Sequence, residues 1–215
     1  MRHGENPANI TKEFSCRHVD YWLTDKGELQ AQQTAEYLAD KEIDEIYASP
    51  LKRAAETAQI IGDWLGLPVV VMDDFREVDV GELELHPTLE NWTRHNQVLL
   101  GWLNGQPEVK FPGGDNYFSL WERMQRGLAK ISKGKSDKNI VVVAHGGIFT
   151  LSMRDLCPTV DITQLLGGTM KNCSISEILV RLEQDRPVGE LVTWAYHEHL
   201  HGEAAEFVNP LPEGT

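Results

Sequence analysis

Four short segments of the sequence hold polar side chains that could together transfer a phosphoryl group. Arg2 and His3 lie in "MRHGEN", Arg53 in "SPLKRAAET", Glu77 in "FREVDVGE" and His145 in "VVVAHGG". A neutral imidazole is a nucleophile near pH 7 and can form a covalent intermediate. A guanidinium group binds two phosphate oxygens at once, and a protonated carboxyl group can give its proton to the leaving oxygen. The set therefore suits phosphoryl transfer, which depends mainly on positioning and on charge stabilisation.

These segments lie at the ends of elements that the sequence pattern predicts. Apolar, β-branched runs at 67–74 and 139–145 are typical of buried strands, and 44–49 gives a shorter strand signal. Apolar residues at helical spacing occur over 23–43, 49–67 and 147–157. Strands that alternate with helices predict the α/β fold class with a mostly parallel sheet. Because ligands of such sheets bind past the carboxyl ends of the strands, we expect the polar residues to converge on one edge.

Two parts of the chain depart from this alternation. The stretches 86–105 and 116–134 both show helical patterns with no strand between them. This predicts a helical cap insertion at about 84–136, over the end of the sheet where ligands bind. The stretches 174–183 and 189–199 predict a pair of strands joined through "QDRPV", which would add an antiparallel edge to the sheet.

The composition narrows the class of protein. The chain has 215 residues, of which 41% are hydrophobic and 25% charged, and these values suit a single globular domain over 1–215. The net charge of −13 argues against a general binder of nucleic acid or of anionic membranes, because both need a basic surface. A few arginines in a cleft could still bind a small anionic substrate. The three cysteines imply no disulfide framework, and no signal peptide or membrane-spanning run is present, so we expect a cytoplasmic protein.

The four segments resemble those of the histidine phosphatase superfamily, the phosphoglycerate mutase-like group. "RHGE", "SPLKRAAETA", "FREVDVGE" and "VVVAHGG" follow the order and the spacing of that family over essentially the whole chain. "LTDKGELQA" is similar to the family's LTxxGxxQA segment, and Asn9 falls where the family has a phosphate-contacting asparagine. The resemblance implies a three-layer sandwich, in which helices cover both faces of the sheet and a variable helical cap is added.

The resemblance also implies a role for each residue of the site. His3 would be the phosphorylated nucleophile, and Glu77 would protonate the leaving group and then act as the base for water. The phosphoryl group would be held by Arg2, Asn9, Ser15, Arg53 and His145. Family members need no metal and no cofactor for this chemistry. The implied activity is metal-independent hydrolysis of a small phosphate monoester, with a small phosphorylated metabolite as the partner and a homodimer as one option for assembly.

The chain departs from the family pattern at its beginning and near Glu77. The family has a strand before RHG, whereas only Met1 precedes it here. We therefore expect residues 1–3 to continue a strand beside "VVVAH", and the natural gene product to start several residues earlier. The family's WEG stands here as Leu83, Glu84 and Leu85, which bears on the local loop contacts but not on Glu77.

Two other functions compete with the phosphatase. The mutase branch of the family carries an ERHYG-like stretch and longer insertions, whereas this short chain has "EVDVG", which favours a phosphatase. A non-enzymatic binding protein on the same fold usually lacks a catalytic histidine or arginine, and here all are present. The substrate stays open among sugar phosphates, phosphoglycerates, nucleotides and phosphorylated cofactor precursors.

One stretch imitates a different enzyme. "HEHLH" at 197–201 fits the H-E-x-x-H pattern of zinc proteases, which needs both histidines on one helical face and a third ligand. The preceding "LVTWAY" is typical of a strand, and no histidine follows residue 201. We interpret the stretch as the end of a surface or interface strand, where His197, His199 and His201 would share a face and could bind a metal adventitiously, and we expect no functional metal site.

Overall fold

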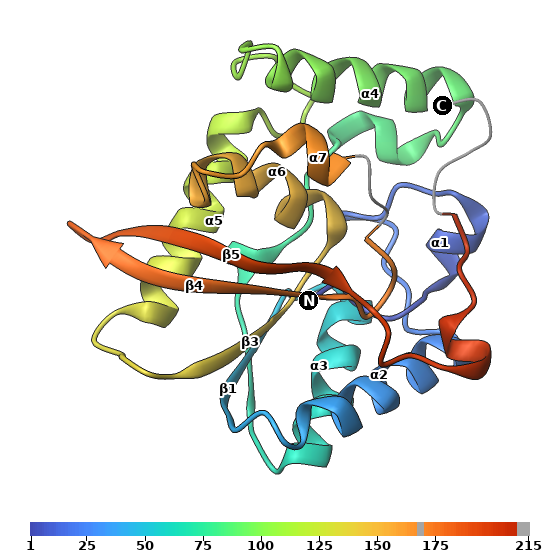
Figure 1. The fold of residues 1–215 in the computed structure, drawn as a ribbon. Helices are drawn as coiled ribbons and strands as arrows, with labels where there is room; N and C mark the ends of the chain where they lie inside the picture. Colours follow the sequence, from blue (N-terminus) through green and yellow to red (C-terminus); the bar gives the residue numbers. More distant parts are fainter. Residues whose placement is uncertain (167–169, 210–215) are drawn as a thin grey trace.

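The strands of the protein form a parallel sheet and an antiparallel hairpin. The computed structural model describes residues 1–166 and 170–209 (Figure 1). The parallel sheet has the order β2-β1-β3, and its strands are β1 (Ile43–Ala48), β2 (Val69–Val71) and β3 (Asn139–Val143). The hairpin pairs β4 (Ile175–Glu183) with β5 (Arg186–Tyr196). The predicted α/β class and the mostly parallel arrangement are confirmed.

The hairpin turn is tighter than the sequence pattern predicts. Glu183 pairs with Arg186, so only Gln184 and Asp185 form the loop. Both have positive φ, 52° and 62°, as a two-residue turn between twisted antiparallel strands requires. The predicted start of the second strand at residue 189 is therefore wrong by three residues.

The first residues of the chain lie between the two sets of strands. Arg2 forms a parallel bridge with Ala144, just past β3, where the N–H of His3 donates to the carbonyl of Ala144 at 3.0 Å. On the other side, the N–H of Arg2 donates to the carbonyl of Ser174 at 3.1 Å, directly before β4. The expectation that residues 1–3 continue a strand beside "VVVAH" is confirmed.

Two helices cover one face of the sheet. These are α2 (Asp25–Leu38) and α3 (Lys52–Leu65), which pack beside one another at the lower right of Figure 1. Their small and aliphatic side chains meet every second residue of β1 and β3, because side chains alternate between the two faces of a strand. The residues that β1 and β3 bury on this side are Ile46, Ala48, Val141 and Val143.

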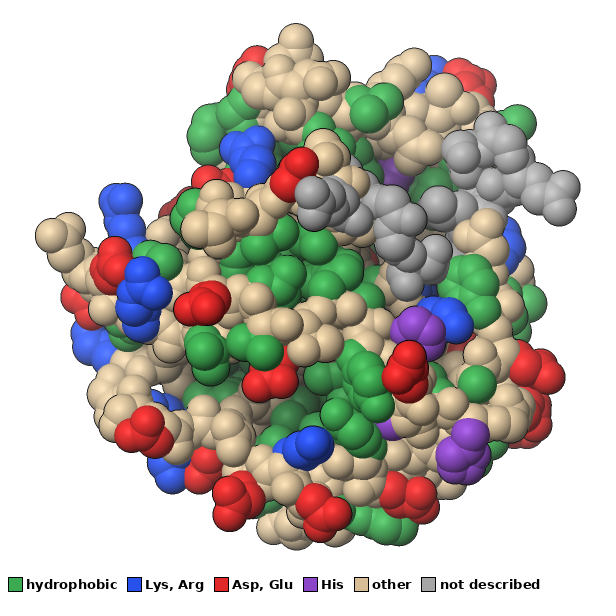
Figure 2. Space-filling view, viewed as in Figure 1, with side chains coloured by type: hydrophobic (Ala, Val, Ile, Leu, Met, Phe, Trp, Pro, Cys, Tyr) green, Lys and Arg blue, Asp and Glu red, His purple; other side chains and the backbone are tan. Residues whose placement is uncertain are grey.

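The opposite face carries the larger core. Tyr47, Ile140 and Val142 point to this side and pack against α5 (Tyr117–Ser132) and α6 (Gly146–Leu156). Helices thus cover both faces, and the three-layer sandwich is confirmed. Figure 2 shows separate acidic side chains along the lower edge of the molecule, and hydrophobic side chains gather near the middle of that face.

The segment 84–136, which interrupts the alternation of strands and helices, forms one helix against the sheet and one away from it. α5 lies against the sheet, whereas α4 (Leu89–Leu103) lies apart from the strands at the top of Figure 1. Trp92 of α4 stacks on Phe14 with ring centroids 4.1 Å apart, and its indole N–H donates to the carbonyl of Lys12 at 3.0 Å. α4 is therefore fixed to the segment that leads into Ser15. The single-domain boundaries and the role of 84–136 as a cap stay predictions.

The remaining elements are short. They are α1 (Pro7–Thr11), α7 (Ile162–Leu166) and the 3-10 helices η1 (Asp73–Phe75), η2 (Gly81–Leu85) and η3 (Gly202–Ala205). Within 1–166 and 170–209, none of the helices is both long enough and apolar enough to cross a bilayer.

Candidate active site

His3 is held in one protonation state by its two neighbours. Its ring Nδ1 lies 2.7 Å from the carbonyl oxygen of Gly4, and its Nε2 accepts a hydrogen bond from Nε of Arg53 at 3.0 Å. A carbonyl oxygen only accepts and a guanidinium only donates, so the proton must be on Nδ1 and the free electron pair on Nε2. The side chain is buried at the point where the Met1–His3 strand ends. Nε2 is therefore the nucleophilic atom of this imidazole.

His145 is fixed by the same reasoning. It follows β3 at the N-terminus of α6, and its Nδ1 accepts from Nη2 of Arg53 at 2.9 Å. The proton is then on Nε2, which lies 2.7 Å from Oγ of Ser49. The rings of His3 and His145 have centroids 5.2 Å apart, so one guanidinium, that of Arg53, contacts both histidines.

Burial and nearby cations keep both histidines uncharged. Loss of solvent is the main cause that lowers the pKa of His3 and of His145 well below the usual value, and the positive charges of Arg53 and Arg2 lower both further. The carbonyl of Gly4 opposes this for His3 but does not outweigh it. At neutral pH the pair therefore consists of two neutral imidazoles.

Arg2 and Arg53 are buried guanidinium groups without an ion-pair partner among the residues that the structure describes. Nη1 of Arg2 donates to the carbonyl of Met170. Burial lowers the pKa of each arginine to about 10, and the carboxylate of Glu77 is the first charge that opposes this shift. Two desolvated cations side by side are costly unless an anion joins them, so this arrangement favours binding of a doubly charged anion.

Glu77 lies at the N-terminus of α6, beside His145. Its Oε1 accepts from the backbone N–H groups of Val78 and Ile148, both at 2.8 Å, and its Oε2 accepts from that of Gly147 at 3.1 Å. The first turn of a helix offers such unsatisfied N–H groups to carboxylates. A Cβ atom at Gly147 would come within 2.8 Å of Oε1, so a side chain at this position would have to displace the carboxylate of Glu77.

Ser15 is the second anchor of Arg53. Its Oγ accepts from Nη1 and its carbonyl from Nη2 of Arg53, each at 2.8 Å. The hydroxyl itself donates to the carbonyl of Val19 at 2.5 Å. Ser15 thus lies in the cluster with His3, Arg53 and His145, although the sequence alone does not fix its alignment.

Glu84 organises the loop that carries Ser15, a role that the sequence analysis missed. Its carboxylate is 2% exposed and accepts four backbone hydrogen bonds, from Cys16, Arg17, His18 and Val19, at 2.6 to 3.2 Å. Burial acts to raise the pKa of Glu84, but these donors outweigh it and lower the pKa. The only indication of this role in the sequence was that Glu84 occupies the glutamate position of the family's WEG stretch.

Asn9 contacts the nucleophile segment through another asparagine. Nδ2 of Asn172 donates both to the carbonyl of His3 at 3.1 Å and to Oδ1 of Asn9 at 3.0 Å. Asn9 also closes the capping box of α1 with Asn6. The Asn9 side-chain oxygen thus has structural partners, and its link to His3 is indirect.

The "HEHLH" stretch does not form a strand or a helix. β5 ends at Tyr196. Nε2 of His199 then forms a hydrogen bond with Oγ1 of Thr34 at 3.0 Å, and Nδ1 of His201 lies 3.2 Å from Nε2 of Gln33. The interpretation as a strand end is wrong, because the chain turns onto α2. In the described parts of the chain, no three histidine, cysteine or acidic residues are grouped as metal ligands would be.

The fold as a whole is that of known phosphatases. The phosphoserine phosphatase of Entamoeba histolytica, solved in complex with 3-phosphoglyceric acid, superposes with a TM-score of 0.74 at 26% identity over 93% of this chain and 96% of that chain. A putative alpha-ribazole-5'-P phosphatase of Escherichia coli K-12 superposes with a TM-score of 0.70 at 24% identity, over 91% and 94% of the two chains, and shows the fold.

Residues 1–195 match the sequence model of the histidine phosphatase superfamily (branch 1), and the chain belongs to this family. Among curated proteins, a Bacillus subtilis (strain 168) protein named "Uncharacterized phosphatase PhoE" is 33% identical over 82% of this chain and 87% of its own. A probable phosphoglycerate mutase, GpmB of Enterobacter sp. (strain 638), is 33% identical over 83% and 82%. Relatives thus carry both phosphatase and mutase names.

Proposed function

We propose that the protein is a phosphatase that hydrolyses a small phosphate monoester through a phosphohistidine on His3. The observation that carries this proposal is the tautomer of His3. Its Nδ1 carries the ring proton and donates it to the carbonyl of Gly4, so the electron pair of Nε2 faces Arg53. A neutral imidazole whose nitrogen pair faces the cationic side chain of Arg53 is suited to attack a phosphoryl group bound there. Membership of a phosphatase family supports the same reaction.

In the first step Nε2 of His3 forms a bond to phosphorus while the bond from phosphorus to the ester oxygen breaks. In this proposal Glu77, at the start of α6 beside His145, takes part in the first step as a carboxylic acid and gives its proton to the leaving oxygen, which leaves Glu77 as a carboxylate. In the second step water attacks the phosphohistidine, Glu77 accepts a proton from that water, and inorganic phosphate and neutral His3 are released.

The phosphoryl oxygens are held in this proposal by Arg2, Asn9, Ser15, Arg53 and His145. Before substrate binds, one N–H of Arg53 is bonded to the reacting nitrogen of His3. An incoming phosphate offers stronger, charged acceptors to the same guanidinium. Arg53 therefore moves its donors to the phosphate oxygens, and the electron pair of Nε2 becomes free to react.

The decisive experiment replaces His3 by alanine. We expect hydrolysis of p-nitrophenyl phosphate to be lost, by about 10⁴-fold or more, because the covalent route is removed. Rapid quenching of the unaltered enzyme with a ³²P-labelled ester should trap label on the protein, and the His3→Ala variant should carry none. Activity of the variant close to that of the original enzyme would refute the phosphohistidine mechanism.

A mutase is the second candidate, because three relatives are named as probable phosphoglycerate mutases. The enzyme should be incubated with 3-phosphoglycerate, with and without a bisphosphoglycerate primer. Phosphate release that outruns formation of the isomeric phosphoglycerate supports the phosphatase, and the opposite ratio supports the mutase.

The identity of the ester, the cytoplasmic location and the assembly belong to the same proposal. Relatives carry names for phosphoserine and alpha-ribazole phosphatases, so a panel of small phosphorylated metabolites is the appropriate screen. Light scattering after gel filtration distinguishes the proposed homodimer from a monomer of 24.3 kDa.

A further inference from the structure

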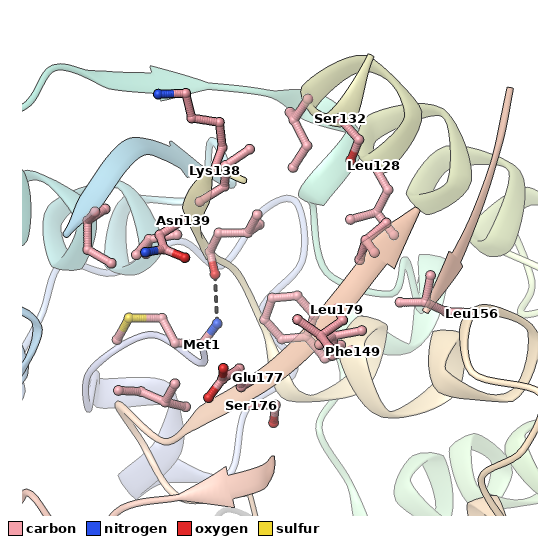
Figure 3. Close-up of a pocket in the computed structure, with 18 of the residues that line it drawn as sticks. Met1, Leu128, Ser132, Lys138, Asn139, Phe149, Leu156, Ser176, Glu177 and Leu179 are labelled. Carbon is pink, nitrogen blue, oxygen red and sulfur yellow. Dashed lines mark hydrogen bonds between the residues drawn. The ribbon is translucent and has the colours of Figure 1, made fainter. Parts of the chain in front are cut away.

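Helix α5 contacts two regions of the molecule that lie apart in the sequence. Its last turns, at Leu128 and Ser132, line a cavity of about 710 Å³ together with Asn139, the first residue of β3 (Figure 3). Arg123 lies earlier in the same helix, and its side chain reaches the segment that carries Glu77. One helix therefore lies against both the sheet and the segment of the proposed acid.

The guanidinium of Arg123 binds the backbone on both sides of the Cα atom of Glu77. Its Nη1 donates to the carbonyl of Arg76, and its Nη2 donates to the carbonyl of Glu77 at 3.4 Å. Nη2 also donates to Oδ2 of Asp115 at 2.8 Å, and the side chains of this ion pair are largely buried. A planar guanidinium with several donors can hold such a set in one geometry. Arg123 thus fixes the direction in which the Glu77 side chain leaves the backbone.

Asp115 extends the same hold to the residues that follow Glu77. Its Oδ2 accepts from the backbone N–H of Asp79 at 3.0 Å, and its own N–H donates to the carbonyl of Asp79 at 2.8 Å. The two backbones touch here, because a Cβ atom at Gly114 would come within 2.2 Å of that carbonyl. The ion pair of Arg123 and Asp115 therefore holds the backbone before, at and after Glu77.

We propose that Arg123 and Asp115 are positioning residues, which hold the backbone at Glu77 so that its carboxyl group meets the N-terminus of α6. This inference rests on the proposed function, because it takes Glu77 as the acid. A glutamate side chain has many rotamers, so its carboxyl group keeps one place only when both of its ends are held. The N–H groups of Gly147 and Ile148 hold the carboxylate, and Arg123 holds the backbone.

The test compares Arg123→Gln with Arg126→Gln in the full chain. Arg126 is the matched control, because it lies on the same helix and its Nε donates to Oδ1 of Asp74 at 2.6 Å, a side chain rather than the backbone at Glu77. Arg123 borders a cavity of about 430 Å³ that is lined by charged side chains, so water can take the place of the lost donors. We therefore expect both variants to fold.

The first measurement is kcat/KM for a series of substituted phenyl phosphates, since kcat/KM includes the step in which the ester bond breaks. Without a positioned acid the phenol must leave as an anion, so the less acidic phenols are affected most. For Arg123→Gln we expect a loss of about 10-fold or more with phenyl phosphate and of less than about 3-fold with p-nitrophenyl phosphate. Arg126→Gln should follow the original enzyme with every ester.

The second measurement follows the carboxylate itself and needs no turnover. The N–H groups of Gly147 and Ile148 bind the carboxylate of Glu77. Their amide exchange should become faster by about 10-fold or more in Arg123→Gln, because a displaced carboxylate no longer protects them. Exchange in Arg126→Gln should equal that of the original protein.

Asp115→Asn is the second variant, should Arg123→Gln fail to fold. The amide keeps an acceptor for the N–H of Asp79 but removes the charge that holds Arg123. We expect the loss with phenyl phosphate to exceed that with p-nitrophenyl phosphate by roughly 3-fold or more. An unchanged ratio between the two esters would refute the positioning role of the pair.

Glu77→Gln separates this inference from the proposed function. If Glu77→Gln responds strongly to the acidity of the phenol and Arg123→Gln does not, the positioning role is overturned and the acid stays. If Glu77→Gln responds as the original enzyme does, Glu77 is not the acid and both fail. Equal losses of Arg123→Gln with all esters, unchanged exchange at Gly147 and Ile148, or the same changes in Arg126→Gln would each overturn the positioning role.

Discussion

At the scale of single residues, neighbours with only one hydrogen-bonding role determine where the protons are. The carbonyl of Gly4 can only accept and Arg53 can only donate, so His3 and His145 each have a single tautomer. The two rings carry opposite tautomers, with the free pair on Nε2 of His3 and on Nδ1 of His145. A single buried arginine thus prepares one histidine for attack and orients the other.

The lowered pKa values of His3 and His145 make stability depend on pH. Below about pH 6.5 the unfolded chain protonates these histidines, whereas the folded chain keeps them neutral. The unfolded state then binds more protons, so the free energy of unfolding falls as the pH drops, by up to about 1.4 kcal/mol per pH unit for each histidine. Urea unfolding at pH 7.5, 6.5 and 5.5 measures the slope, which should be shallower in His145→Gln. A flat profile between pH 7.5 and 5.5 would contradict the neutral pair.

A substitution at Gly147 tests whether the position of Glu77 matters for catalysis. In Gly147→Ala the new methyl group would lie 2.8 Å from Oε1 of Glu77 and must displace the carboxyl group. If Glu77 protonates the leaving group, kcat should fall about 10²-fold or more for an alkyl phosphate but much less for p-nitrophenyl phosphate, whose leaving group needs no proton. Gly146→Ala is the matched control, because its methyl group would meet Arg2 at an ordinary 3.7 Å. An equal loss with both substrates would exclude Glu77 as the acid.

At the scale of elements, 3-10 helix η2 holds the loop of residues 15–19 through one side chain. The carboxylate of Glu84 accepts hydrogen bonds from the N–H groups of four successive residues, and the carbonyl and hydroxyl of Ser15 accept hydrogen bonds from Arg53. The chain of contacts runs from η2 through the loop to the arginine between the two histidines. An acidic side chain far from the reacting atoms thus positions Arg53.

Replacement of Glu84 by alanine should therefore affect both stability and substrate binding. Four N–H groups lose their acceptor, and we expect the free energy of unfolding to fall by about 2–4 kcal/mol and KM for p-nitrophenyl phosphate to rise about 10-fold. Glu84→Gln keeps one acceptor oxygen and should recover part of both. The exposed neighbour Glu82 provides the control, since Glu82→Ala leaves the loop contacts intact. A normal KM in Glu84→Ala would show that the loop does not position Arg53.

At the scale of the whole molecule, the charge of the site opposes that of the chain. The protein has a net charge of −13, yet Arg2 and Arg53 are buried side by side without an ion pair in the described residues. An anion that neutralises them should stabilise the fold, because it binds the folded state only. The sheet supports this arrangement by bringing both arginines to one edge.

Inorganic phosphate is the simplest probe of that site. At roughly 100 times its Kd it should raise the free energy of unfolding by about 2.7 kcal/mol, whereas chloride at the same ionic strength should not. Arg53→Lys should lose most of this response, because a lysine cannot hold two phosphate oxygens and both histidines together. Lys52→Ala, on the neighbouring residue whose amine lies over the ring of Trp22, should respond as the original protein does. An equal rise in the free energy of unfolding with chloride would contradict a site specific for phosphate.

The α/β class, the order of strands and helices along the chain, and the four segments that meet at the sheet edge could be predicted from the amino-acid sequence. It could do so because parallel strands end at the same edge, so residues that follow them must converge. The boundaries of the segments could not be predicted in the same way, because the two-residue turn at Gln184 and Asp185 depends on positive φ angles that neither residue type requires.

Contacts between residues that are distant in the sequence arise from the packing of the folded chain. The tautomers of His3 and His145 depend on Arg53, which is 50 and 92 residues away from them, and the loop of Ser15 depends on Glu84, about 68 residues away. Spacing along a chain predicts which residues share an edge or a face, whereas proton positions, anchors and cavities arise from packing between elements.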